Sequence, residues 1–249
     1  MAWVLDLDGV VWLGHQVIPG APEAVARLRA AGERVVFVTN NSSARVGDKE
    51  AELEGHGIPA SGDVLTSAMA AAWLLEPGST ALVCAGPGVD EALELRGVTA
   101  VREGDADAVV VGFHLDFDYG RLLVAHRAVR RGARLVATND DPTYPTPHGL
   151  IPGGGAIVAA VATACGIPAV VAGKPNPPMA ALVDDLVGGG PHTVVGDRDD
   201  TDGAFARALG ARFALVLSGA TTAGEVPTDP APDLVAPDLA TLVAAALRG

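Results

Sequence analysis

Short apolar runs rich in β-branched residues alternate with helix-forming segments along this chain of 249 residues. The first runs, residues 4–7, 34–38 and 64–66, are separated by helical patterns near 22–31 and 45–56. Strands that alternate with helices in this way predict a parallel sheet with helices packed on it, because parallel strands need long crossover connections. We therefore predict an α/β fold built on a parallel sheet.

The strand–helix pattern breaks at Pro77-Gly78-Ser79 and then restarts. The restarted block closes with a long polar stretch, residues 139–155, whose Asp, Pro and Gly content is typical of a binding loop. We predict that residues 1–76 and 166–249 form a core domain and that residues 77–165 form an inserted α/β domain. Further strands are predicted at 80–84, 108–112, 133–138, 169–172, 193–195, 213–217 and 234–235, and further helices at 69–75, 89–95, 119–131, 157–165, 179–186, 205–209 and 239–247.

Two aspartates stand at the end of the first apolar run, Asp6 and Asp8, followed by Gly9. A turn that begins at Asp8-Gly9 would leave both carboxylates at the carboxyl end of a buried strand, where open α/β sheets bind ligands. Two carboxylates this close repel each other unless a cation neutralises them, and Mg²⁺ prefers such oxygen ligands. The alternative is a capped strand end with a solvated turn.

Three further polar stretches end or follow apolar runs. They are Thr39-Asn40-Asn41, Lys174, and the pair Asp197 and Asp202. Together with the first aspartates they supply acids for a metal, hydroxyl and amide donors, and one lysine cation. Phosphoryl transfer needs such a set, and an aspartate can be its nucleophile. Taken alone, the Thr-Asn-Asn stretch could be a helix-capping loop and Lys174 a surface lysine.

The order of motifs DxDGV, TNN, GKP and GDRxxTD resembles the haloacid dehalogenase superfamily, and within it the type IIA capped branch of NagD-like phosphatases. Residues 139–156 are similar to the cap loop of that branch, so the resemblance covers nearly the whole chain. It implies a Rossmann-like parallel-sheet core with an inserted α/β cap domain for substrate specificity. It also implies a Mg²⁺-dependent phosphatase that hydrolyses a small-molecule phosphate monoester through an aspartyl-phosphate intermediate.

The resemblance also implies a role for each acidic and basic motif residue. Asp6 would be the nucleophile and Asp8 the general acid and base. Asp6, the backbone carbonyl of Asp8, and Asp197 would hold Mg²⁺. Lys174 would offset charge on the nucleophile and the phosphoryl group, and Asp202 would orient Lys174 or the surroundings of the metal.

The polar residues of the second motif and of the cap loop are predicted to bind substrate. The resemblance implies that Thr39 and the backbone at Asn40 bind phosphoryl oxygens, with Asn41 beside them. Something else must recognise the leaving group, and the long polar loop is the candidate. Its proposed contact residues are Asp140, Asp141, Tyr144 and His148. The alternative is a loop that only braces the inserted domain or forms a dimer contact.

One histidine, His114, departs from the pattern of the branch that the chain resembles. His114 stands in the order Gly-Phe-His, where the branch often carries Asp in place of His. We expect a loop histidine at the surface of the inserted domain.

The composition limits the classes of binding partner that we expect. The net charge of −13 and the sequence pI of about 4.7 argue against nucleic acid or an anionic membrane as the main partner. We find no signal peptide and no apolar run of membrane-spanning length, and two cysteines give no disulfide framework. We therefore expect a cytoplasmic monomer or homodimer that acts on a small phosphorylated metabolite.

Two other functions remain open on the same fold. A phosphomutase would use the same aspartyl phosphate, but such mutases typically carry a smaller helical cap close to the first motif, where this chain has only a short link. A catalytically silent binding protein would not need Asp6, Asp8, Lys174 and Asp197 all to be intact. The sequence does not identify the substrate among nucleotides, glycerol phosphate, phosphoglycolate, sugar phosphates and pyridoxal phosphate.

Overall fold

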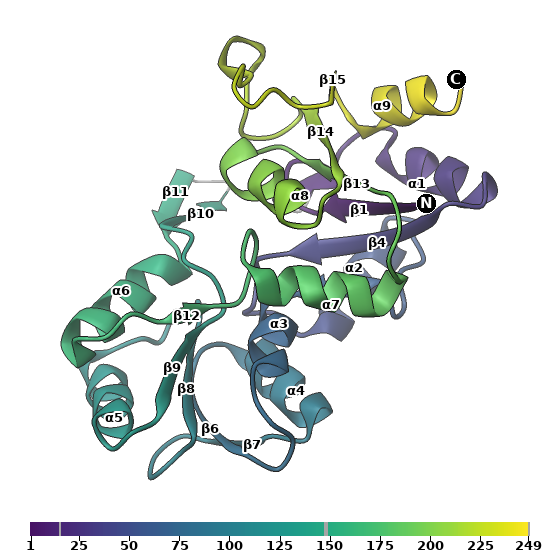
Figure 1. The fold of residues 1–249 in the computed structure, drawn as a ribbon. Helices are drawn as coiled ribbons and strands as arrows, with labels where there is room; N and C mark the ends of the chain where they lie inside the picture. Colours follow the sequence, from purple (N-terminus) through teal and green to yellow (C-terminus); the bar gives the residue numbers. More distant parts are fainter. Residues whose placement is uncertain (15, 147–148, 249) are drawn as a thin grey trace. The chain divides into compact units, whose positions relative to one another are not determined.

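The computed structural model describes residues 1–14, 16–146 and 149–248. The chain forms two compact units, each built from segments that are separate in sequence (Figure 1). The first unit comprises Met1–Thr39, Lys49–Leu65 and Lys174–Gly249, and the second comprises Asn40–Asp48 and Thr66–Gly173. The chain therefore passes from one unit to the other at 39/40, 48/49, 65/66 and 173/174. The predicted domain limits, at residues 77 and 165, differ from these positions. That the second unit governs specificity stays a prediction.

The first unit is organised around a six-stranded sheet in the order β15-β14-β13-β1-β4-β5. Strand β1 pairs in parallel with both β4 and β13, and β14 pairs in parallel with both β13 and β15. The strands are β1 (Ala2–Asp6), β4 (Arg34–Thr39), β5 (Val64–Thr66), β13 (His192–Gly196), β14 (Arg212–Val216) and β15 (Leu234–Ala236). A short antiparallel hairpin, β2 (Trp12–Leu13) and β3 (Gln16–Val17), follows β1.

Helices connect these strands in two directions along the sheet. Helix α1 lies between β1 and β4 in the chain, whereas α8 lies between β13 and β14 on the other side of β1. Right-handed crossovers that run in opposite directions place such helices on opposite faces, which explains why the central strands are buried along most of their length. The helices and helical turns are α1 (Ala21–Ala30), α2 (Val46–Gly55), α7 (Pro177–Val187), the π-helical turn η1 (Asp199–Gly203), α8 (Ala204–Ala208), the 3₁₀ turn η2 (Ala223–Glu225) and α9 (Leu239–Ala246).

The second unit has its own parallel five-stranded sheet in the order β12-β9-β8-β6-β7. Its core joins aliphatic side chains of the central strands to those of helices α5 and α6. The strands are β6 (Thr80–Cys84), β7 (Thr99–Val101), β8 (Ala108–Val111), β9 (Arg134–Ala137) and β12 (Val170–Val171). The helices are α3 (Ser67–Trp73), α4 (Pro87–Arg96), α5 (Tyr119–Arg130) and α6 (Gly154–Cys165).

The predicted α/β class with a parallel sheet is confirmed, but two predicted loops contain antiparallel hairpins. The stretch 139–155 carries β10 (Thr143–Thr146) paired with β11 (Gly149–Pro152), and the predicted link after the first strand carries β2 and β3. Strands this short show little alternation, and proline is tolerated in a two-stranded ribbon although it argues against a central strand. None of the helices in the described ranges is both long and apolar enough to cross a bilayer.

Candidate active site

The polar motif residues of the first unit lie at the carboxyl edge of its sheet. Asp6 is the last residue of β1 and lies opposite Val38, so Thr39 at the end of β4 is one residue further along the same edge. Asp197 directly follows β13, the other neighbour of β1. Chain connections leave β1 and β13 in opposite directions, which makes this edge the topological switch point where α/β sheets bind ligands.

Lys174 holds two of the aspartates together. Its Nζ donates to Oδ1 of Asp6 at 2.8 Å and to Oδ1 of Asp202 at 2.6 Å. The lysine side chain is only 4% exposed. Burial by itself lowers the pKa of Lys174, but the two carboxylates outweigh burial and raise that pKa above its ordinary value. Lys174 is therefore a fixed positive charge beside Asp6.

A close approach of two loops positions Asp197. Its Oδ2 accepts a hydrogen bond of 2.6 Å from the backbone N–H of Ala220, and Ser218 Oγ donates to the carbonyl of Gly9 at 2.7 Å. Gly9 has φ +82°, and a Cβ there would lie 2.4 Å from Oδ2 of Asp197. Only glycine fits this position, since it alone combines the left-handed backbone with no side chain.

Asp202 reaches the same edge through a helical turn. The turn η1 brings its backbone N–H to the carbonyl of Arg198 at 2.9 Å, and the backbone N–H of Arg198 donates to Oδ2 of Asp202 at 3.3 Å. A Cβ on Gly196 would lie 2.2 Å from Cβ of Asp202. The absence of a side chain on this glycine, at the end of β13, therefore leaves space for the side chain of Asp202. Asp202 is 1% exposed and its carboxylate is engaged by Lys174.

The cluster has more negative than positive charge. One carboxylate oxygen each from Asp6, Asp197 and Asp202 lie within 4.8 Å of one another. Burial raises the pKa of Asp6 well above its ordinary value, since the nearby Lys174 only partly offsets it. Burial, reinforced by the Asp202 charge, raises the pKa of Asp197 to about 6. Hard oxygen donors with excess negative charge fit a divalent cation such as Mg²⁺. Asp6 and Asp202 each accept a hydrogen bond from Lys174, so these contacts do not distinguish them as ligands, and the choice of Asp6 with Asp197 follows the family resemblance.

Asp8 has a different environment. Its Oδ1 accepts a hydrogen bond of 3.2 Å from Nε1 of Trp12, and Lys49 Nζ lies 5.2 Å from the centre of the Trp12 ring. Burial raises the pKa of Asp8, while the Lys49 charge and the Trp12 hydrogen bond act against this rise. A carboxyl group with a raised pKa suits proton transfer to a leaving group.

The predicted substrate-binding residues of the second unit form a network with one another. Asn40 Nδ2 donates to Oδ2 of Asp141 at 3.1 Å, and Asn41 Nδ2 donates to the hydroxyl of Tyr144 at 3.1 Å. Asn139 Nδ2 donates to the carbonyl of Asn40 at 2.7 Å. The second motif, Thr39-Asn40-Asn41, thus bonds through its two asparagines to residues 139–155, which carry the β10–β11 hairpin and are called the hairpin-bearing loop below. Asp140 is exposed, and His148 lies outside the described residues.

His114 is not at the surface as expected. It is 6% exposed, with Nδ1 2.9 Å from the carbonyl of Gly112 and Nε2 4.0 Å from Sγ of Cys84. The ring also meets the edge of Phe117 at a centroid distance of 5.7 Å. The expectation was wrong because Cys84 of β6, 30 positions away, and Phe117 cover the ring, and no local pattern indicates the contact with Cys84.

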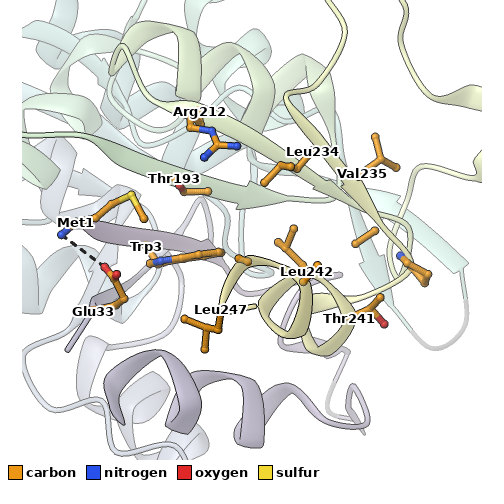
Figure 2. Close-up of a pocket in the computed structure, with 14 residues that line it drawn as sticks. Met1, Trp3, Glu33, Thr193, Arg212, Leu234, Val235, Thr241, Leu242 and Leu247 are labelled. Atoms are coloured by element: carbon orange, nitrogen blue, oxygen red, sulfur yellow. Dashed lines mark ion pairs between the residues drawn. The ribbon is translucent and has the colours of Figure 1, made fainter. Parts of the chain in front are cut away.

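A separate pocket of about 360 Å³ lies at the opposite edge of the first sheet (Figure 2). It is bordered by the first residues of β1, β13 and β14, including Trp3, Thr193 and Arg212, and by aliphatic side chains of β15 and α9 such as Leu234 and Leu242. None of the aspartates of the cluster lines it, so this pocket is not the predicted site.

Comparison with known proteins tests the predicted family. Residues 3–99 match the family described as haloacid dehalogenase-like hydrolase, and residues 171–242 match one described as HAD-hydrolase-like. The acid sugar phosphatase of Staphylococcus saprophyticus is 34% identical over 81% of this chain and 80% of its own length. The chain belongs to the haloacid dehalogenase-like hydrolases. The predicted membership is confirmed.

Other relatives in this hydrolase family are also named as phosphatases. The D-glycerol 3-phosphate phosphatase of Mycobacterium tuberculosis is 40% identical over 88% of this chain, which spans only 64% of that protein's length. The crystal structure of the M. tuberculosis glycerol phosphate phosphatase in complex with magnesium has a TM-score of 0.90, 37% identity, and coverage of 97% of this chain and 75% of that one. The α/β fold and the magnesium cofactor expected for this hydrolase agree with that relative.

Two residues of the hydrolase site were missed in the sequence. Trp12 contacts Asp8, and Lys49 lies against Trp12. A signal did exist, since the chain contains only two lysines, Lys49 and Lys174, and both lie among the acidic residues of the first unit. The contact of Trp12 with Asp8 joins residues only four positions apart, whereas the contact of Lys49 with Trp12 depends on long-range packing, which local spacing does not encode.

Proposed function

We propose that this protein is a Mg²⁺-dependent phosphatase that hydrolyses a small phosphate monoester through an aspartyl-phosphate intermediate. The observation that supports it most directly is the geometry of Lys174, which bridges Asp6 and Asp202 beside Asp197. An ammonium and a carboxylate cluster of this kind can orient a nucleophile and stabilise a phosphoryl group.

Each residue then has a defined chemical role. A carboxylate oxygen of Asp6 forms a bond to phosphorus while the ester P–O bond breaks, and Asp8 gives a proton to the leaving oxygen. Asp8, now ionised, removes a proton from the water that attacks the aspartyl phosphate, so phosphate leaves and both aspartates are restored. Asp6, Asp197 and the backbone carbonyl of Asp8 would hold Mg²⁺, which would supply positive charge at the phosphoryl group. Thr39 and the backbone at Asn40 bind phosphoryl oxygens.

We assign the substrate to phosphate esters of small polyols, a class that includes glycerol phosphate and sugar phosphates. Relatives of this chain carry the names D-glycerol 3-phosphate phosphatase and acid sugar phosphatase, which supports the assignment. A phosphomutase would leave the phosphoryl group on a sugar phosphate, and a binding protein would leave the ester intact. Measurement of free phosphate separates all three.

Metal removal is the first test. The substrates are glycerol phosphate, sugar phosphates and p-nitrophenyl phosphate, each at about 1 mM. We expect phosphate release in the presence of Mg²⁺, and we expect EDTA to lower its rate by at least about 100-fold. Excess Mg²⁺ should restore the rate. Mg²⁺ should also raise the Tm less at pH 5 than at pH 7.5. The pKa of Asp197 is about 6, so at pH 5 a proton competes for this ligand. Phosphate release that EDTA leaves unchanged would contradict the proposal.

Specificity is tested on the hairpin-bearing loop. Asp140→Ala and Asp141→Ala are expected to change the ranking of kcat/KM among polyol phosphates by about tenfold while turnover of p-nitrophenyl phosphate changes less than about threefold. Asp140 is exposed, and Asp141 accepts the Asn40 hydrogen bond, so the pair separates direct contact from loop positioning. Glu103→Ala, another exposed acidic site of the second unit, is the matched control. An unchanged ranking in both variants would show that the loop does not select substrate.

A further inference from the structure

The indole of Trp12 makes a directed contact with the carboxyl group of Asp8. Nε1 of Trp12 donates to Oδ1 of Asp8 at 3.2 Å, and Trp12 is 1% exposed. An indole N–H is a donor only, so Oδ1 of Asp8 must be the acceptor in this hydrogen bond and cannot donate a proton to Trp12. Among the described residues, this is the one hydrogen bond to the Asp8 side chain.

Several contacts hold the indole in place. The backbone N–H of Trp12 donates to the carbonyl of Leu7 at 3.1 Å, and its carbonyl accepts from Gly9 N–H at 2.7 Å. On the ring, Lys49 Nζ lies 5.2 Å from the centroid and the His56 ring lies 6.2 Å away. Lys49 is in turn bound to Glu52 at 2.9 Å. All of these residues belong to the first unit, and together they fix the direction of the N–H.

We propose that Trp12 is a positioning residue that engages Oδ1 of Asp8 and so leaves Oδ2 as the oxygen that delivers the proton to the leaving group. The inference rests on the proposed phosphatase function. As the ester P–O bond breaks, its electron pair passes to the leaving oxygen, which takes the proton from Oδ2, and Asp8 becomes a carboxylate. Without the indole, the carboxyl group can rotate and present either oxygen.

The proposal predicts a dependence on the leaving group. An alkoxide such as that of glycerol is a poor leaving group and needs a proton during bond cleavage, whereas p-nitrophenolate leaves without one. Loss of correct positioning should therefore slow cleavage of alkyl phosphates and have little effect on p-nitrophenyl phosphate. A general loss of structure would slow both substrates equally.

The test compares Trp12→Phe with Trp3→Phe. Trp3 is also buried, lies on β1 of the same unit, and its Nε1 has no hydrogen-bond partner within the described ranges. In Trp12→Phe we expect kcat/KM for glycerol phosphate to fall about tenfold or more, with p-nitrophenyl phosphate within about threefold of wild type. We compare kcat/KM because it reports the transfer of the phosphoryl group to Asp6 and not the later hydrolysis of the aspartyl phosphate, which is common to both substrates. Trp3→Phe should leave the ratio of the two rates unchanged.

A second variant covers the case in which Trp12→Phe does not fold. Incorporation of 3-benzothienylalanine at position 12 keeps the bicyclic shape and replaces the N–H by sulfur, and it should reproduce the selective loss. In an Asp8→Asn background, the residual rates should no longer respond to the change at position 12. Equal losses on both substrates, or no loss on glycerol phosphate, would overturn the proposal. Absence of phosphate release from wild type on either substrate would instead refute the proposed function.

Discussion

Asp6→Asn is expected to abolish phosphate release, with a loss of about 10⁴-fold or more on any substrate that the wild type accepts. An amide is not a nucleophile toward phosphorus, and one charged oxygen is lost from the candidate Mg²⁺ site. Folding should survive, because Lys174 keeps its ion pair with Asp202 and the repulsion with Asp197 is relieved. The metal-free variant is therefore expected to be at least as stable as wild type in thermal unfolding.

The matched control for Asp6→Asn is Asp200→Asn, the same chemical change at an exposed aspartate in the turn after β13. Asp200 pairs with Arg198 at the surface, with a side chain that is 68% exposed. Its substitution should leave kcat/KM within about twofold of wild type, since exposed ion pairs contribute little. Wild-type turnover by Asp6→Asn would eliminate the covalent mechanism and with it the proposed role of this residue.

Lys174→Met is expected to cause the largest loss of stability as well as loss of activity. The substitution leaves Asp6 and Asp202 buried without their shared counter-charge, and breaking a buried ion pair on one side costs about 3–5 kcal/mol. Urea unfolding at pH 7.5 without Mg²⁺ measures this change. Added Mg²⁺ should restore part of the stability but not phosphate release, because the ammonium that orients Asp6 is absent.

The only other lysine supplies the control for that experiment. Lys49→Met removes the ion pair with Glu52 and the contact with Trp12, and about 1 kcal/mol or less should be lost from the free energy of unfolding. Equal losses in the two lysine variants would contradict the assignment of Lys174 as the central charge of the cluster.

Residues at the strand ends could be placed from the sequence because each follows a buried apolar run. The parallel pairing of β1 with β4 and β13 then brings Asp6, Thr39 and Asp197 to one edge without further information. The contact of Asp202 with Lys174 was implied only by family resemblance. It depends on the π-helical turn and on the absence of a side chain at Gly196.

Features that depend on long-range packing were not predictable in this way. The contact of His114 with Cys84 and the contact of Lys49 with Trp12 each join residues 30 or more positions apart. The sequence predicts loops where the structure has two short hairpins, because strands of two to four residues show too little alternation of apolar and polar side chains to be identified. The limits of the compact units also follow from packing, since the segment 40–48 joins the second unit although it directly follows a strand of the first.

The aspartate cluster, Lys174, and Trp12 all come from the first unit, whose central sheet forms without any strand lying wholly in the second. Substitutions between residues 66 and 173 therefore change none of the residues that form this cluster. On the proposed mechanism, selection for bond cleavage acts mainly on the first unit, and selection for the choice of substrate acts mainly on the second. A recombination event that exchanged the second unit would have to carry residues 40–48 together with residues 66–173, because Asn40 and Asn41 bond to Asp141 and Tyr144.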